Sequence, residues 1–391
     1  MKKLFALMLA SLLVFALAAC GNQPATPDPE PEPEVVDEGN DPEVEPDVDD
    51  PDVADADVVD MRIALVAHSP ESILDDGSFN QGAWDGIQRF LATHGLSSDH
   101  AQFFQPHSGD DEARVDLVAD AVNDFGANVV VLPGFHFIAA SAEMQAIFPD
   151  VNFILLDASP ADDIASNLVA IHYAEEQAGF LAGYAAVQEG FRDLGFMGGI
   201  AVPAVVRFGH GFLQGAEYAA EALDLGPGDV TVQYYYIGGF APDPGVATTA
   251  SAWFADGIEV IFAAAGGAGF SVMSGAEAAD GFVIGVDVDQ SGANDVVITS
   301  AMKALDVSVY DMLTDILNGS FRGGRELMFD ASVNGIGLPM DTSRFANFTL
   351  AQYEAIFALL ADGTISVNND LADVPSADDL GLSLVELTVI N

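Results

Sequence analysis

Short apolar runs of strand length recur along the chain from Met61 onward, and a segment with helical periodicity follows most of them. The runs are rich in Val, Ile and Leu, which is typical of strands buried on both faces of a parallel sheet. Alternation of such strands with helices predicts βαβ units and therefore an α/β fold. The expected strands span 61–68, 101–106, 128–134, 151–158, 167–173, 193–200, 230–237, 259–267, 282–289 and 296–303. The expected helices span 78–95, 111–126, 137–149, 175–190, 204–223, 244–257 and 307–319.

The alternating pattern occurs twice, because one series ends near Tyr173 and another begins near Asp193. We therefore expect two doubly wound, Rossmann-like lobes. Lobe 1 is expected at about 61–172 plus a returning segment near 296–325, and lobe 2 at about 173–295 plus the C-terminal segment. Ligands of open α/β sheets bind at the carboxyl ends of the strands. Two such lobes facing each other predict a ligand cleft between them.

Residues 1–20 have the features of an export signal. Lys2 and Lys3 give a positive start, and the apolar run that follows is too short to span a membrane. The run ends in Leu-Ala-Ala-Cys, which resembles a bacterial lipobox and implies a lipoprotein signal peptide with Cys20 as the lipidated residue. An ordinary signal peptide followed by a free thiol is the alternative. Since Cys20 is the single cysteine, a disulfide within the chain is excluded.

Residues 21–60 differ from the rest of the chain in composition, with sixteen Asp or Glu, no Lys or Arg, and frequent Pro. Such a segment cannot bury enough apolar surface to fold, and charge repulsion keeps it extended. It is predicted to be a disordered, acidic, Pro-rich linker. The folded, two-lobed domain is expected to occupy 61–391.

The formal net charge of −50 is extreme for 391 residues. A negative field of this size repels nucleic acid and anionic membrane surfaces, so both are excluded as partners of the folded part. The simplest explanation of the charge is a solvated surface that tolerates salt or alkali. Net charge informs on solubility and environment rather than on fold.

Unusual residues follow the expected strands at their carboxyl ends, where a ligand of an α/β sheet binds. Among them is Lys303, the only lysine beyond Lys2 and Lys3. The candidate ligand-binding residues are His68, Phe79, Asn80, Asp157, Phe240, Gly266, Gly267, Asp287 and Lys303.

Several of these residues lie in longer motifs: "DDGSFNQGAWDGI", "FILLD", "GFMGG", "IGVDVDQ" and "SAMKALDVSVYD". Over about 61–341 these patches are similar, in order and spacing, to the basic membrane lipoprotein family of purine-nucleoside-binding proteins that serve ABC transporters. The resemblance implies a type I periplasmic-binding-protein fold with more than one crossover strand. It also implies a monomeric lipoprotein on the extracytoplasmic face of the cell membrane, which needs no cofactor and passes its ligand to a permease.

The resemblance assigns roles to five of the candidates. Phe79 and Phe240 would stack on the purine base, and Asp157 would accept a hydrogen bond from a base N–H group. Asp287 and Lys303 would hold the ribose hydroxyls while keeping each other ionised. From the residues alone, packing of both phenylalanines in the core is the favoured interpretation, and Asp157 could equally cap a turn.

The remaining candidates are less specific. Asn80 could contact the ligand or cap the helix that follows it, and Gly266 and Gly267 would allow close backbone approach. His68 stands where the family commonly has Asp or Asn. It can donate or accept a hydrogen bond, so the base preference stays open.

Three other functions were weighed. A nucleosidase is disfavoured, because the sequence has no HExxH, nucleophile elbow, P-loop or paired Cys ligands; neither an enzyme nor a metal site is expected. A ligand-sensing lipoprotein for a membrane regulator would share the same fold. A binding protein for another small polar ligand such as a sugar is the third alternative.

Overall fold

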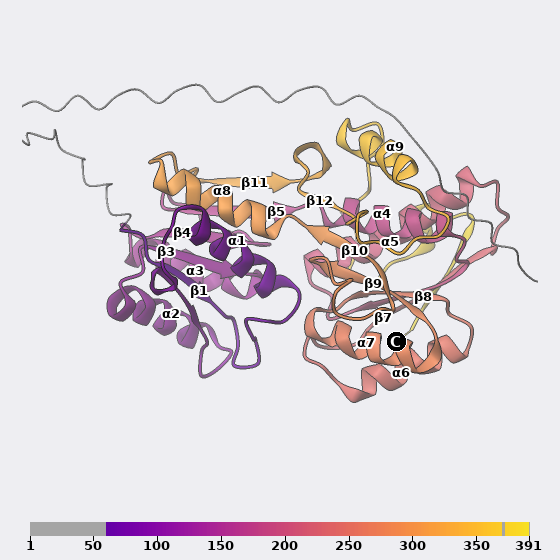
Figure 1. The fold of residues 1–391 in the computed structure, drawn as a ribbon, viewed down its shortest axis with the longest axis horizontal. Helices are drawn as coiled ribbons and strands as arrows, with labels where there is room; N and C mark the ends of the chain where they lie inside the picture. The colour runs from indigo at the N-terminus through magenta and orange to yellow at the C-terminus, as the bar shows by residue number, and fades with distance from the viewer. Residues whose placement is uncertain (1–59, 370–371, 391) are drawn as a thin grey trace, which may run out of the picture. The chain divides into compact units, whose positions relative to one another are not determined.

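The computed structural model describes residues 60–369 and 372–390, which form an α/β domain (Figure 1). The expected signal peptide with Cys20, and the linker up to residue 59, lie outside the described residues. The strands are β1 (Ile63–Val66), β2 (Ala101–Phe104), β3 (Val129–Pro133), β4 (Asn152–Leu156), β5 (Leu168–Tyr173), β6 (Asp193–Gly198), β7 (Val230–Tyr236), β8 (Val260–Ala264), β9 (Phe282–Asp287), β10 (Val297–Lys303), β11 (Arg325–Phe329), β12 (Ile336–Gly337) and β13 (Val385–Val389). The α-helices are α1 (Phe79–Thr93), α2 (Asp111–Asp120), α3 (Ile138–Ile147), α4 (Glu175–Glu189), α5 (Pro203–Ala222), α6 (Pro244–Ala255), α7 (Gly269–Ala279), α8 (Leu305–Leu317), α9 (Leu350–Ala361) and α10 (Ala377–Leu380).

Two sheets organise the domain. The first has the order β11-β5-β4-β3-β1-β2, and all its strand pairs are parallel. The second has the order β12-β10-β9-β8-β6-β7-β13, in which only the pair of β10 and β12 is antiparallel. Every residue of the central strands β1, β3 and β8 is buried, as expected for parallel strands covered on both faces.

The chain returns to the first lobe later than the sequence suggested. The expected returning segment began near 296, but β10 pairs with β9 and belongs to the second sheet. The return is made by α8, which packs against α1, and by β11, which pairs with β5 (Figure 1). The expectation was wrong for β10 because an apolar strand carries no signal of which sheet it joins.

The sequence interpretation also missed α7, β11 and the elements that follow β11. The α7 segment is rich in Gly, Ser and Ala, and it has little helical periodicity to detect. The edge strands β11 and β13 expose several of their residues, so neither resembles a buried strand. The chain passes between the two sheets after β5, after β10 and after β11, which is the more-than-one crossover that the family resemblance implied.

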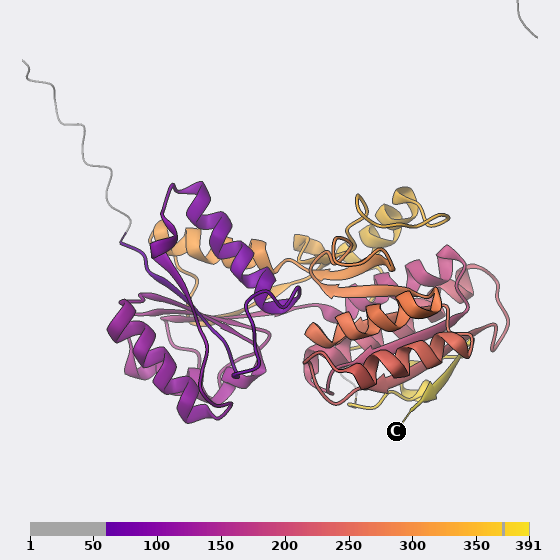
Figure 2. The same cartoon turned by 60° about the horizontal axis from the view of Figure 1, so that its bottom comes forward.

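The helices α4 and α5 lie in close contact (Figure 1), in the lobe on the right of Figure 2, and glycines permit this contact. A Cβ atom added at Gly183 would lie 2.0 Å from the carbonyl oxygen of Phe212, and one at Gly215 would lie 2.0 Å from that of Phe180. Only glycine fits at such a distance. The pair therefore brings Glu175, at the start of α4, close to Arg207 on α5.

No helix in residues 60–369 and 372–390 combines the length and apolar character needed to cross a bilayer.

Candidate ligand-binding cleft

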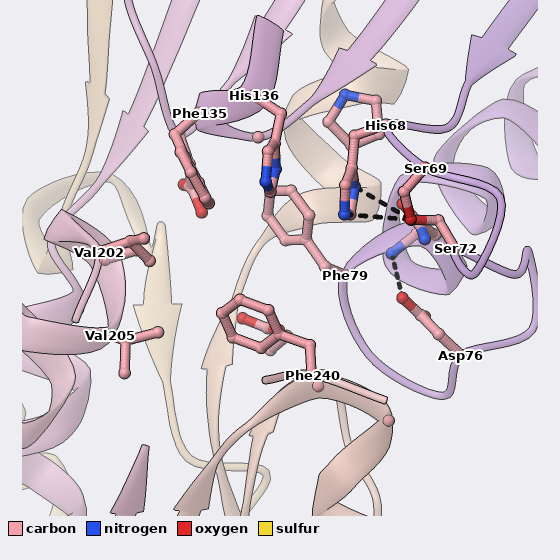
Figure 3. Close-up of a pocket in the computed structure, with 18 of the residues that line it drawn as sticks. His68, Ser69, Ser72, Asp76, Phe79, Phe135, His136, Val202, Val205 and Phe240 are labelled. Carbon is pink, nitrogen blue, oxygen red and sulfur yellow. Dashed lines mark hydrogen bonds between the residues drawn. The ribbon is translucent and has the colours of Figure 1, made fainter. Parts of the chain in front are cut away.

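A cavity of about 500 Å³ opens at the carboxyl ends of strands from both sheets (Figure 3). Residues after β1, β3 and β4 line it from the first lobe, and residues at the ends of β8, β9 and β10 line it from the second. The cavity is lined by all nine residues that the sequence suggested: His68, Phe79, Asn80, Asp157, Phe240, Gly266, Gly267, Asp287 and Lys303.

Lys303 ends β10, and its ammonium group lies among carboxylates. The Nζ atom is 2.6 Å from Asp157 Oδ2, 3.2 Å from Asp287 Oδ1 and 3.6 Å from Glu175 Oε1. The lysine side chain is only 2% exposed. Asp157 follows β4 of the first sheet and Asp287 ends β9 of the second, so one buried ammonium links the two lobes.

Glu175 was missed by the sequence interpretation. It is the first residue of α4, its side chain is fully buried, and its Oε2 accepts a hydrogen bond of 2.7 Å from Arg207 Nε. Burial alone would raise the pKa of Glu175, but Lys303 and Arg207 outweigh burial and lower it. The available signal was an acidic pair at 175–176, placed between a buried strand and an apolar helix.

The cluster holds three carboxylates and two cations, and the pKa values of its carboxyl groups are not all shifted in the same direction. Burial raises the pKa of Asp157 to about 7, although Lys303 opposes this. Burial alone would lower the pKa of Lys303, but Asp157, Asp287 and Glu175 raise it above its usual range. Lys303 therefore stays charged, and Asp157 takes up a proton more readily than Glu175 does.

Asp157 and Asp287 share an uncommon backbone conformation. Their φ angles are +55° and +67°, in the left-handed region that few residues other than glycine adopt, although aspartate is among those that do. Backbone strain of this kind collects at ligand-binding sites. At both strand ends, the residue with this backbone conformation has its carboxylate in the cavity wall.

Phe79 and Phe240 extend their rings into the cavity from different lobes (Figure 3). Phe79 is the first residue of α1, and the Nζ atom of Lys303 lies 4.6 Å from its ring centroid. Phe240 follows β7 and lies on Gly199 so closely that a Cβ atom there would be 2.2 Å from Phe240 Cε1.

The two candidate glycines lie against Phe240. Gly266 has a φ of +53°, and a Cβ atom at Gly267 would be 3.2 Å from the Phe240 carbonyl oxygen. A larger residue at Gly267 would press on the backbone that carries this phenylalanine, whereas at Gly266 it would strain its own backbone, because φ is positive there.

Asn80 forms hydrogen bonds with the loop 69–78, which leads from β1 to α1. Its Nδ2 donates to the Ile73 carbonyl over 3.0 Å, and its backbone N–H donates to Asp76 over 3.0 Å. The amide group is therefore engaged within the first lobe, although it lines the cavity.

The end of the same loop contacts the second lobe. Ser78 Oγ donates to Asp287 Oδ2 over 2.6 Å, and Gln290 Nε2 donates to the Gly77 carbonyl over 2.8 Å. A Cβ atom at Gly77 would be 2.5 Å from Phe270 Cζ. The loop thus joins the lobes at one side of the cavity.

His68 is joined in the cavity wall by His136, which the sequence interpretation did not single out. Their rings are parallel, with centroids 4.2 Å apart. His136 lies three residues after β3 within the sequence Gly-Phe-His-Phe. Its position soon after a buried strand was the available signal.

Among residues 60–369 and 372–390, no group of three or more His, Cys, Asp or Glu side chains is placed to hold a metal ion. Two acidic side chains of the cavity, Asp157 and Asp287, pair with the ammonium group of Lys303 instead.

Residues 63–368 match the family described as ABC transporter substrate-binding protein PnrA-like. The chain is 31% identical over 277 residues to Basic membrane protein B of Borreliella burgdorferi, covering 69% of this chain and 79% of that protein. It is 26% identical over 304 residues to the ABC transporter nucleoside-binding protein BmpA of Lactococcus lactis, covering 73% and 83%.

Solved structures show the same fold. An ABC transporter solute-binding protein from Aeropyrum pernix matches with a TM-score of 0.63 and 24% identity, over 78% of this chain and 87% of that chain. A solute-binding protein from Conexibacter woesei matches with the same TM-score and identity, over 79% and 99%. The expected periplasmic-binding-protein fold is therefore confirmed, and the chain belongs to the PnrA-like family of ABC transporter substrate-binding proteins.

Proposed function

We propose that this substrate-binding protein takes up purine nucleosides outside the cytoplasm and delivers them to the permease of an ABC importer. The observation that carries the proposal is the pairing, in one cavity, of two aromatic rings with a buried ion pair at the strand ends. Phe79 and Phe240 provide apolar faces for a base, and Asp287 with Lys303 provides polar partners for a diol. The similarity to a relative named as nucleoside-binding supports it.

The chemistry of a nucleoside fits these groups. A purine base stacks between aromatic faces, which contributes roughly 1–3 kcal/mol per base. The ribose hydroxyls donate to the Asp287 carboxylate and accept from the Lys303 ammonium group. Asp157, already beside Lys303, accepts from a donor on the base or sugar. A neutral ligand leaves the charge balance of the buried cluster unchanged.

The proposed role is binding without catalysis. Asp157, Asp287 and Lys303 engage one another, and in the proposal they hold the ligand rather than attack it. Incubation of the protein with inosine or guanosine, followed by assay for free base, tests this. Release of free base would mean that the protein is a nucleosidase.

The proposal includes a lipid anchor at Cys20 and a monomeric protein on the outer face of the cell membrane. Replacement of Cys20 by Ser should move the protein from the membrane fraction to the soluble fraction. Unchanged membrane partitioning of the variant would contradict the anchor, while leaving ligand binding untouched.

Calorimetry across a ligand panel tests the central proposal. Inosine, guanosine and adenosine should bind more tightly than uridine, hypoxanthine or ribose, because only purine nucleosides fill both the aromatic and the polar parts of the cavity. Tighter binding of a sugar than of every purine nucleoside would overturn the proposal and favour a sugar-binding protein.

A further inference from the structure

Three rings stand in a row in the wall of the cavity (Figure 3). Phe135 and His136 have ring centroids 3.9 Å apart with an interplanar angle of 34°, and His136 and His68 have centroids 4.2 Å apart with an angle of 1°. His136 is the middle ring, so both of its faces are covered. Its edge is the part that a ligand can reach.

The two histidines differ in what their nitrogens contact. Both ring nitrogens of His68 lie near the hydroxyl group of Ser72, at 3.1 and 3.2 Å, so this ring is already engaged. In the part of the chain that the structure describes, no hydrogen bond reaches a ring nitrogen of His136. His136 therefore presents an unused donor and acceptor at the cavity wall.

The other long polar side chains of the cavity have their donors engaged. Arg114 donates to the His68 carbonyl, to Asp111 and to the Gly109 carbonyl. Lys303 lies among carboxylates and, in the proposed function, donates to the ribose rather than to the base. The Asn80 amide donates to a carbonyl of its own loop. A purine base carries acceptors, such as the ring nitrogen N7 and the oxygen at C6, which carboxylates cannot satisfy. A base in this cavity therefore needs a donor from elsewhere.

His136 is neutral near pH 7, so it carries one N–H donor and one acceptor. Burial lowers its pKa to about 4, and the Arg114 guanidinium acts in the same direction while Asp111 opposes it. Burial also lowers the pKa of His68 to about 4, with help from His136 and Arg114. The loop 69–78 also contributes charged side chains to the cavity lining, and the one closest to His68 in sequence is Glu71.

We propose that His136 is a ligand-contacting residue that donates its ring N–H to an acceptor on the purine base, and that His68, held by Ser72, positions it. This inference rests on the proposed function and adds a determinant of base recognition. It favours purines with acceptors on the edge that carries N7 and the substituent at C6. His68 acts through the stack and makes no direct contact in this proposal.

The test compares guanosine binding by the parent protein, His136→Phe and His68→Phe. Phenylalanine preserves the stack and removes the nitrogens. His136→Phe should weaken binding about tenfold, because a buried acceptor on the base loses its partner. His68→Phe should weaken it less, and His107→Phe, at an exposed position outside the cavity, should leave it unchanged. His136→Gln, which restores an N–H donor, should recover part of the loss.

Two analogues separate a direct contact from a structural effect. 7-Deazaguanosine lacks the N7 acceptor, and 2-aminopurine riboside lacks the oxygen at C6. One of them should bind the parent more weakly than guanosine does, yet lose little further affinity in His136→Phe, because the same hydrogen bond is already gone. Thermal melting shows whether each variant is folded.

The outcomes are distinct. If the parent binds no purine nucleoside, the proposed function fails and this inference fails with it. If the parent binds guanosine and folded His136→Phe binds it equally well, the proposed function stands and the role of His136 is wrong. Equal further losses for both analogues in His136→Phe would also overturn the contact.

Discussion

At the scale of single residues, the buried cluster around Lys303 joins stability to ligand binding. A buried charge pair is a weak source of net stability, but removing one partner leaves the other charge buried and unpaired. Here one ammonium group balances carboxylates that come from three places in the chain: after β4, at the start of α4 and at the end of β9. Arg207 forms a direct ion pair with Glu175. The cleft is therefore held together by the same side chains that are proposed to bind the sugar.

Replacement of Lys303 by Met should lower the free energy of unfolding by about 3–5 kcal/mol, the usual cost of leaving buried charges unpaired. Urea denaturation measures this. Lys303 opposes the raised pKa of Asp157, so without the ammonium group this pKa should rise further above its unfolded value, and the stability of the variant should increase as the pH is lowered from 8 to 5.

Two controls accompany this variant. Arg89→Met breaks an ion pair with Asp306 whose side chains are 47% and 44% exposed, so it should cost less than about 1 kcal/mol. Asp157→Asn combined with Lys303→Met should recover part of the lost stability, because one unpaired carboxylate is removed. A Lys303→Met protein as stable as the parent at pH 8 would show that the cluster does not need its lysine.

Replacement of Phe79 or Phe240 by Ala should reduce nucleoside binding by roughly 1–3 kcal/mol, the range for one stacked base. The measurement is calorimetry with inosine, alongside thermal melting. A variant that melts well below the parent, but whose folded fraction binds normally, would assign that phenylalanine to the core.

The residue types of the site could be predicted from the sequence, but their partners could not. Lys303, Asp287 and Asp157 were predicted because each follows a buried strand. The family resemblance assigned Asp157 to the base and the other two to the sugar, whereas the structure places both carboxylates, Asp157 and Asp287, beside the ammonium group of Lys303. Glu175 and His136 were missed because their local signals, an acidic pair and a position after a strand, are weak, and their contacts depend on how separate elements meet.

At the scale of elements, the two sheets share no strand pair within the described residues, and a loop and a pair of helices make contacts between the lobes. The loop 69–78 reaches Asp287 and Gln290 of the second lobe through Ser78 and Gly77. The helices α4 and α5 follow strands of different sheets and lie in contact through glycines. Strand runs were predicted well because burial leaves an apolar pattern, while the crossing of these helices depends on single glycines that periodicity does not reveal.

Gly183→Ala should destabilise the domain by about 1–3 kcal/mol, since the added methyl group meets the backbone of Phe212 at 2.0 Å and the helices must separate. The matched control is Gly269→Ala at the start of α7, where the nearest atom to an added Cβ is 3.8 Å away. This change should have little effect or stabilise by up to about 1 kcal/mol. Similar melting temperatures for both variants would contradict the close contact.

At the scale of the whole molecule, the net charge of −50 opposes the compact state through self-repulsion. Salt screens such repulsion, because the Debye length falls from about 10 Å at 0.1 M to about 3 Å at 1 M. The sequence therefore predicts an effect of salt on the whole domain, separate from any single ion pair.

The melting temperature should rise as NaCl is increased from roughly 0.1 to 1 M, the range over which screening becomes short. KCl should act equally, since screening does not depend on which monovalent ion is used. A fall in melting temperature over this range would mean that favourable ion pairs outweigh the net repulsion.

The isolation of Lys303 has a practical consequence for chemical labelling. Apart from Lys2 and Lys3, it carries the only side-chain primary amine of the chain, and it is 2% exposed and protonated. Amine-reactive esters attack neutral, accessible amines, so they should hardly modify position 303 while the lobes are together. Acylation at this single position, followed by mass spectrometry, would therefore report how often the cleft opens, and a bound ligand should slow it.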